Sequence, residues 1–295
     1  MNLPLTWVND KLSKNIDRVG FQTKDIKLDL VKKYNPSKDL EGFLTDINEP
    51  TIPEYLSFLV ARSRGRSDLE QLSPVLQAVI SYKISAYDCL EDNHLYKCGR
   101  ETVLKTRGKD YLLMMMDVYS NISTELGARL QDLGIDDASR VAKEQYEDII
   151  RADKRRNSKI IQPLKETIKI QEALAGEPAR KLAYLSGGGL SEQRFLFHLV
   201  NSICTLEDLM HFLIKKDLKE PKSTIPLSFM NEQTPLNKMK ENPRLLRKSV
   251  RFTLDYINNQ MSELNKLKKQ GEFKEIDDFT GSINRFIKQY ILSKI

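Results

Sequence analysis

The amino-acid sequence predicts an all-α protein, and two observations support this prediction. Apolar residues recur at helical spacing along most of the chain, and the sequence lacks alternating Val, Ile and Thr runs bounded by Asn-Gly or Asp-Gly turns. Glycine and proline are sparse, at 13 and 11 of 295 residues. We therefore expect about ten or more helices around a central cavity. No composition break divides the chain, so we expect one domain over residues 1–295.

Helix start and stop signals place the elements. Pro53 fits the first turn of one helix, and Ser73-Pro74 is expected to cap the next, which reaches Asp88. Further elements are helices at about 112–122, 138–150, 195–214, 246–270 and 275–294, loops at Glu177-Pro178 and at residues 186–189, and a polar connector over 219–246.

Charge and cysteine content limit the classes of protein. The net charge is +6, and the basic residues are spread along the chain with short clusters such as Lys154-Arg155-Arg156. Such clusters are typical of solvated faces, so we expect no nucleic-acid partner, whereas a mild basic excess suits phosphate substrates. The three cysteines form no CxxC pair and are odd in number, so a disulfide framework is not expected. The expected location is therefore the reducing cytoplasm. No apolar run reaches the roughly 20 residues that span a bilayer, and the N-terminus does not resemble a signal peptide.

Two acidic helical segments are the candidate functional residues. The first is Asp88-Cys89-Leu90-Glu91-Asp92, in which Asp88 and Asp92 are one helical turn apart. The second contains Glu207 and Asp208, followed by His211. Carboxylates are the ligands that Mg²⁺ prefers, so Asp88, Glu91, Asp92, Glu207 and Asp208 are candidate metal ligands. The alternative is an exposed acidic helix end, and His211 is a poor Mg²⁺ ligand with a structural role as its alternative.

These segments and their surroundings resemble the trans-isoprenyl diphosphate synthases, the polyprenyl synthetase family. Its first pattern is Asp-Asp-x-x-Asp, then Arg-Arg-Gly-x-x-Thr, a glycine and Gly-Asp. Its second is Phe-Gln-x-x-Asp-Asp-x-x-Asp, then Asp-x-x-x-x-Lys-x-Thr-x-Pro. The first pattern corresponds here to Asp88–Asp92, Lys97–Thr102, Gly108 and Met116-Asp117, and the second to Ile203–His211, Asp217, Lys222, Thr224 and Pro226.

The resemblance implies a class I isoprenoid synthase-like helical bundle that condenses an allylic diphosphate with isopentenyl diphosphate, with Mg²⁺ as cofactor. It implies catalytic roles for Lys97 and Lys222, and a chain-length channel near Lys83 and Ile84. The substrate-binding residues that it implies are Lys165, Lys215, Lys216 and Lys222. It also implies a dimer, either with a second copy or with an active prenyltransferase.

The chain departs from the family pattern at several positions. Cys89 replaces the second aspartate, and Lys97-Cys98 replaces the arginine pair. Residues 48–52 carry no base where the family has a basic loop for isopentenyl diphosphate. We expect weak elongation unless Arg62, Arg64 or Arg66 replaces that loop, loss of metal-dependent activity in Asp88→Ala, and a gain in Cys89→Asp.

Three functions follow from these features. The first is a Mg²⁺-dependent prenyltransferase. The second is a non-catalytic, prenyltransferase-like subunit that regulates an active partner. The third is a class I terpene cyclase or another enzyme that ionises a diphosphate, for which the missing basic loop is favourable. Against a cyclase, Leu209 stands where its Asn/Asp-x-x-x-Ser/Thr-x-x-x-Glu metal motif, read from Asn201, requires Glu.

Overall fold

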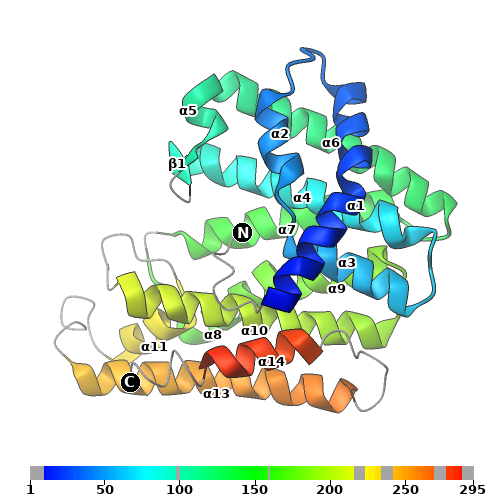
Figure 1. Ribbon diagram of the computed structural model, residues 1–295. Coiled ribbons are helices and arrows are strands. Elements are labelled where there is room, and N and C mark those ends of the chain that lie inside the picture. Colours follow the sequence, from blue (N-terminus) through cyan, green and yellow to red (C-terminus); the bar gives the residue numbers. More distant parts are fainter. Residues whose placement is uncertain are drawn as a thin grey trace. The chain divides into compact units, whose positions relative to one another are not determined.

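The protein is helical throughout the part of the chain that the structure describes. This structure, a computed structural model, describes residues 10–97, 100–158, 160–215, 223–233, 242–268 and 277–287. The helices are α1 (Asp10–Tyr34), α2 (Glu41–Asn48), α3 (Ile52–Ser63), α4 (Leu69–Glu91), α5 (Val103–Arg107), α6 (Lys109–Asp132), α7 (Ala138–Arg156), α8 (Leu164–Gln171), the π-helix η1 (Glu172–Gly176), α9 (Glu177–Leu185), α10 (Leu190–Lys215), α11 (Ile225–Gln233), α13 (Pro243–Lys268) and α14 (Asp277–Phe286) (Figure 1). Within these ranges the only sheet is a hairpin of β1 (Tyr96–Lys97) and β2 (Arg100–Glu101), so the all-α prediction is confirmed.

The chain forms two compact units, each with its own buried residues. Unit 1 consists of residues 1–146 and 181–189, and unit 2 consists of residues 147–180 and 190–295. Two of the three boundaries between the units fall inside α7 and α9, and the third falls directly before α10. The single domain over residues 1–295 and the central cavity stay predictions.

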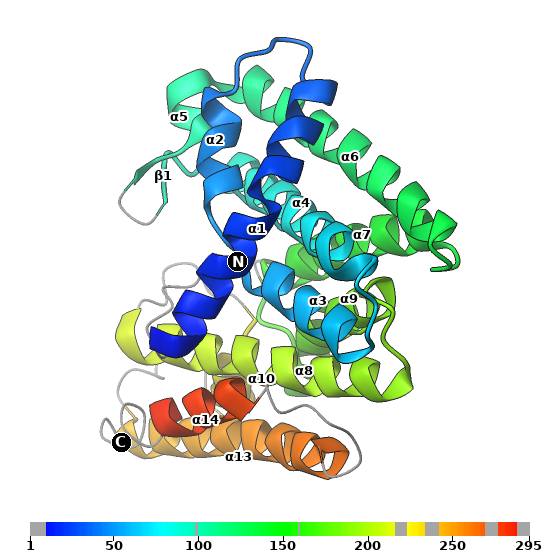
Figure 2. The ribbon, with the colours of Figure 1, turned by 45° about the vertical axis from the view of Figure 1, so that its right-hand side comes forward.

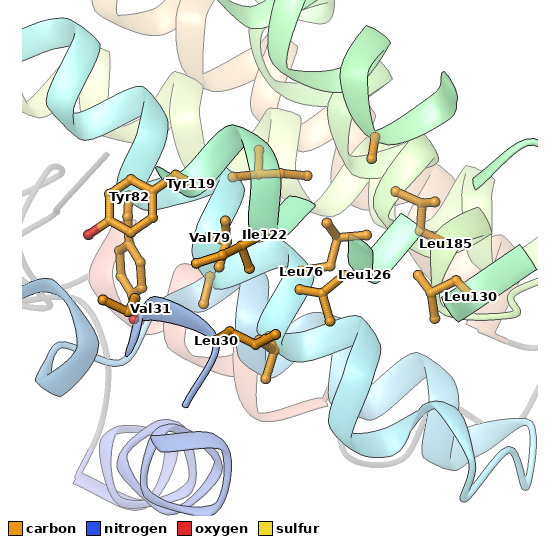
Figure 3. Packing of buried hydrophobic residues seen from close by; sticks show 14 of the residues in the cluster. Leu30, Val31, Leu76, Val79, Tyr82, Tyr119, Ile122, Leu126, Leu130 and Leu185 are labelled. Atoms are coloured by element: carbon orange, nitrogen blue, oxygen red, sulfur yellow. The ribbon is translucent and has the colours of Figure 1, made fainter. Parts of the chain in front are cut away.

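The core of unit 1 surrounds α4, which packs against α1, α3 and α6 (Figures 1 and 2). Between Leu69 and Tyr82 this helix is buried on almost its whole circumference, as expected for a central helix. Figure 3 shows the packing of side chains from α1, α4, α6 and the end of α9, which are Leu30, Val31, Leu76, Val79, Tyr82, Tyr119, Ile122, Leu126, Leu130 and Leu185.

The core of unit 2 lies between α10 and α13, which run side by side in both views (Figures 1 and 2). Apolar residues repeat every three or four positions on each helix, and this spacing places them on one face. The buried residues are Phe195, Leu199, Ile203, Leu206, Val250, Leu254, Ile257, Met261 and Leu264.

The first helix start was predicted correctly, and its reason is local. The Thr51 hydroxyl accepts a hydrogen bond from the Glu54 amide at 3.1 Å, and the Glu54 carboxylate accepts one from the Thr51 amide at 3.3 Å. This reciprocal pair is a capping box, and Pro53 follows at the start of α3, where its missing N–H is not needed.

The next start was predicted wrongly. The helix α4 begins at Leu69, and Pro74 lies inside it. The Ser73 hydroxyl does not cap the helix, because it donates to the buried carbonyl of Leu185 at 2.9 Å. A tertiary hydrogen bond therefore replaces the local cap that the Ser-Pro pair suggested.

Two loop predictions are also wrong. Glu177 and Pro178 continue the helical path, because η1 inserts a wide turn in which the Glu177 amide bonds to the Glu172 carbonyl, and Pro178 then falls in the first turn of α9. The expected connector over 219–246 contains α11, whose Ile225, Leu227 and Met230 are buried. The junction at residues 186–189 is confirmed, with Gly187 at a φ of 77°.

Candidate active site

The first acidic segment lies at the carboxyl end of α4, in unit 1. Asp88 is half-buried in the last turn, Glu91 is exposed, and Asp92 is the C-cap residue, whose amide donates to the Asp88 carbonyl at 3.0 Å. The Glu91 carboxylate accepts a hydrogen bond from the Tyr87 hydroxyl at 2.7 Å. The carboxyl end of a helix carries partial negative charge, so three carboxylates there favour a bound cation. Carboxylates are the ligand type that Mg²⁺ prefers, and a Mg²⁺ site at these residues stays a prediction.

Cys89 is directed away from this exposed end. It is buried with Ala86 and Leu112, against Leu90 and Val103. The new carboxylate of Cys89→Asp would enter an apolar cluster, which argues against the expected gain in activity. That expectation stays a prediction.

The side of α4 that faces α7 carries polar groups at two levels. The Lys83 ammonium lies 3.9 Å from the centre of the Tyr146 ring, a cation–π contact, and burial together with Asp88 raises the pKa of Tyr146. One and a half turns earlier, the buried amides of Gln77 and Gln145 exchange two hydrogen bonds at 3.2 and 2.8 Å. Ile84 is half-buried and packs against the main core of unit 1. The chain-length channel at Lys83 and Ile84 stays a prediction.

A buried ion pair occupies the start of α3, next to the segment that lacks the expected basic loop. The Lys27 ammonium of α1 lies 3.0 Å from the Glu54 carboxylate, and both side chains are 1% exposed. Glu54 also accepts from the Thr23 hydroxyl, and Lys27 donates to the Tyr82 hydroxyl at 3.2 Å. Tyr82 in turn donates to the Glu49 carbonyl at 3.0 Å. Lys27 is thus already paired, and it is not exposed to bind a phosphate.

The arginines expected to replace the basic loop lie elsewhere. Arg62 ends α3, and Arg64 and Arg66 follow in the turn before α4, whereas Asp88 is at the other end of α4. A helix of 23 residues is about 35 Å long, so these arginines are a helix length from the acidic segment. Arg66 also pairs with Asp68 at 2.6 Å and donates to the Leu133 carbonyl at 2.8 Å. This separation argues against the expectation that they replace the loop, which stays a prediction.

The second acidic segment lies within α10, in unit 2, and its Asp208 is paired with an arginine. Glu207 and Asp208 are both buried, and the guanidinium of Arg156, at the end of α7, donates to the Asp208 carboxylate. The exposed fractions of the two side chains are 16% and 9%. Although burial lowers the pKa of Arg156, the Asp208 charge outweighs it and the net shift is upward. His211 is exposed.

Ser223, which follows α10 in the sequence, is hydrogen-bonded to the end of α7 and to the segment after it. The Ser223 amide donates to the Arg156 carbonyl at 2.9 Å, and the Ser223 hydroxyl accepts from the Gln162 amide at 3.0 Å. Nearby, the hydroxyls of Thr167 and Ser228 share a hydrogen bond at 2.7 Å, while Lys165 is exposed on α8. Lys216, Lys222 and the side chains of Lys97 and Lys215 lie outside the described residues.

Each acidic segment is thus placed within its own unit. Among the described residues, no group of three or more His, Cys, Asp or Glu side chains is arranged to hold a metal ion. The expectation that Asp88 and Asp92 face Glu207 and Asp208 concerns residues of different units, and it stays a prediction.

Sequence reasoning missed three of these residues. Lys27 and Glu54 look like ordinary surface charges in the sequence, and Arg156 was assigned to a solvated cluster. A signal for Arg156 was present, because Ala142, Gln145 and Ala152 are buried at helical spacing and Arg156 continues that face one turn later. Its neighbour Arg155, with 55% of the side chain exposed, does fit the solvated cluster.

Comparison with solved structures identifies the fold. The structure is similar to geranylgeranyl pyrophosphate synthetase from Pyrococcus horikoshii Ot3, with a TM-score of 0.74 and 12% identity over 95% of this chain and 99% of that one. It is also similar to geranylgeranyl pyrophosphate synthetase from the archaeon Geoglobus acetivorans (TM-score 0.70, 13% identity, 93% and 99% covered) and to polyprenyl synthetase from Streptomyces coelicolor A3(2) (0.69, 13%, 92% and 98%). No family model and no curated protein matches the sequence.

The chain therefore has the fold of the trans-isoprenyl diphosphate synthases, as its acidic segments predicted. Among the described helices, none is both long and apolar enough to cross a bilayer.

Proposed function

We propose that this protein is a Mg²⁺-dependent prenyltransferase of the isoprenyl diphosphate synthase type, with an allylic diphosphate as substrate. The observation that carries the proposal is the group of carboxylates at the end of α4, where Asp88 and Asp92 stand one turn apart with Glu91 beside them. Oxygen ligands at the negative end of a helix favour a divalent cation. The fold supports the same class of reaction.

The chain has candidate binding residues for the allylic substrate but lacks the expected ones for the second substrate. Bound Mg²⁺ would offset the charge of the diphosphate and favour its departure. The first acidic segment would hold that ion and so position the allylic substrate. For the second substrate, isopentenyl diphosphate, the protein lacks the basic loop that would bind the diphosphate. Lys27 does not replace that loop, because it is paired with Glu54. Each missing charged contact weakens binding by about 1.5–3 kcal/mol, so we expect slow elongation.

The test is a product assay with purified protein, Mg²⁺ and an allylic diphosphate, with and without isopentenyl diphosphate. Asp88→Asn should abolish metal-dependent turnover. Asp110→Asn, which removes an exposed carboxylate of α6, should leave it unchanged. Equal turnover of the wild type and Asp88→Asn would show that the first acidic segment is not the metal site. Diphosphate release without isopentenyl diphosphate, and without elongation when it is added, would favour the cyclase-type reaction.

A second candidate function is a non-catalytic subunit that regulates an active prenyltransferase. Two buried ion pairs favour it, Lys27 with Glu54 and Arg156 with Asp208. In each pair, a charged side chain near a motif that an active enzyme uses for substrate or metal is bound to another side chain of the protein. Inactivity of the protein alone, together with a changed product length when an active prenyltransferase is added, would support this candidate. Size-exclusion chromatography of the mixture would show whether a heterodimer or a homodimer forms.

A further inference from the structure

We infer that Arg156 is a built-in cation that takes the place of a metal ion at the second acidic segment. The inference deepens the proposed function and rests on it, because it specifies how the metal requirement is divided between the two segments. Arg156 neutralises Asp208, so the metal dependence of the protein resides in Asp88, Glu91 and Asp92.

Arg156 and Asp208 are in direct contact. The Arg156 guanidinium donates to Oδ1 of Asp208, and both side chains are largely withdrawn from solvent. A buried carboxylate that stays ionised is stabilised by a positive partner such as a cationic side chain or a metal ion. Asp208 already has the first, and a metal ion at Oδ1 would have to displace the guanidinium.

Arg156 is held by α7 and by the segment after α10. It ends α7, a helix whose inward face includes Ala142, Gln145 and Ala152. Its carbonyl accepts the Ser223 amide at 2.9 Å, which fixes the backbone where the side chain leaves it. The guanidinium is thus positioned by the backbone on both sides of the second acidic segment, α7 before it and Ser223 after it.

Charge and ligand type at the second acidic segment also favour Arg156 over a metal ion. Removing Arg156 would leave Glu207 and Asp208 as adjacent buried carboxylates, whose mutual repulsion a divalent cation relieves. His211, one turn beyond Glu207, is exposed and is a weak ligand for Mg²⁺. In the native protein Arg156 neutralises Asp208, the carboxylate that a divalent cation at the second segment would share with Glu207.

The experiment is a count of bound Mn²⁺, used as a spectroscopic probe for Mg²⁺, by electron paramagnetic resonance of the free ion. It compares the wild type with Asp208→Asn, Arg156→Met and the double variant. The wild type and Asp208→Asn should bind the same number of ions. Arg156→Met should gain one ion, or bind Mn²⁺ at least tenfold more tightly, and the double variant should lose that gain.

The adjacent residue provides the matched control. Arg155 lies on the same helix turn with an exposed side chain, 3.4 Å from Glu166, so Arg155→Met should bind Mn²⁺ as the wild type does. Loss of one ion in Asp208→Asn alone would overturn the inference, and this arm remains decisive if Arg156→Met does not fold. Lack of any gain in a folded Arg156→Met would also overturn it.

A further arm separates this inference from the proposed function. Asp88→Asn should remove Mn²⁺ from the wild type without changing the gain caused by Arg156→Met. If Asp88→Asn removes nothing, the proposed function fails, while the comparison of Arg156→Met with its double variant still decides the role of Arg156.

Discussion

Lys27 of α1 and Glu54 of α3 form an ion pair 3.0 Å apart in which each side chain is only 1% exposed. Glu54 also closes the capping box of α3, so one carboxylate joins two helices and starts one of them. Glu54 closely follows residues 48–52, the segment that carries no base where the family has a basic substrate-binding loop. The charged side chains of this pair therefore stabilise the packing of α1 against α3.

Lys27→Met should destabilise the protein by about 3–5 kcal/mol, because it leaves Glu54 buried without its cation. The free energy of unfolding in urea would measure the loss. Adding Glu54→Gln should recover part of it, since glutamine at this position can still close the capping box. Lys32→Met, on an exposed part of α1, should change stability by less than about 0.5 kcal/mol. Equal effects of the Lys27 and Lys32 variants would contradict the assigned role.

Cys89→Asp should lower stability by about 3 kcal/mol or more and should not raise activity. Its side chain would enter the cluster of Ala86 and Leu112, where an unpaired carboxylate lacks solvation. Thermal unfolding and the product assay would measure the two effects. Cys89→Ala, which adds no polar group, should cost only about 1 kcal/mol. A stable Cys89→Asp protein with faster turnover would show that residue 89 reaches the metal site.

Stability should fall in acid through Glu125 of α6. Burial raises the pKa of its carboxyl, but contacts with Lys33, Tyr34 and Arg129 outweigh this and lower the pKa from 4.5 to about 2. Because the unfolded chain then binds a proton at a higher pH than the folded protein, this stabilisation is complete above pH 4.5 and is lost as the pH falls toward 2.

The unfolding temperature should therefore drop across that range, and Glu125→Gln should flatten the drop, with a loss of about 1–3 kcal/mol near neutral pH. Asp110→Asn, on the same helix, should leave the acid dependence as it is. A wild type and Glu125→Gln with parallel acid profiles would refute the assignment.

Gly176→Ala should destabilise unit 2, whereas Gly281→Ala should not. A Cβ at residue 176, in the π-helix, would lie 2.5 Å from the ring of Phe197, while a Cβ at residue 281, in α14, would have nothing within 4 Å. The expected loss is about 1–3 kcal/mol for the first variant, and the expected gain is up to about 1 kcal/mol for the second, from helix propensity. Urea unfolding of both variants would test the contrast, and a neutral Gly176→Ala would show that Phe197 moves aside readily.

The sequence by itself determined the helical architecture and the class of fold. Apolar spacing predicted the helices because burial of one face follows a period that the chain displays directly. The start of α3 near Pro53 and the glycine junction before α10 were also predicted, since both depend on residues that are neighbours in sequence. The two acidic segments indicated the family because their residue types and spacing lie in short stretches.

Tertiary structure decided which charged and polar residues are available. Ser73 was expected to cap a helix, but its hydroxyl donates a hydrogen bond to the Leu185 carbonyl. The two residues are far apart in sequence, so no local rule predicts this bond. Lys27 and Arg156 read as surface cations, yet each finds a carboxylate on a distant helix, 27 and 52 residues away. Cys89 reads as a lost metal ligand, whereas packing turns it into a core residue. Long-range pairing is set by how helices pack, and helical spacing alone does not encode which side chain meets which.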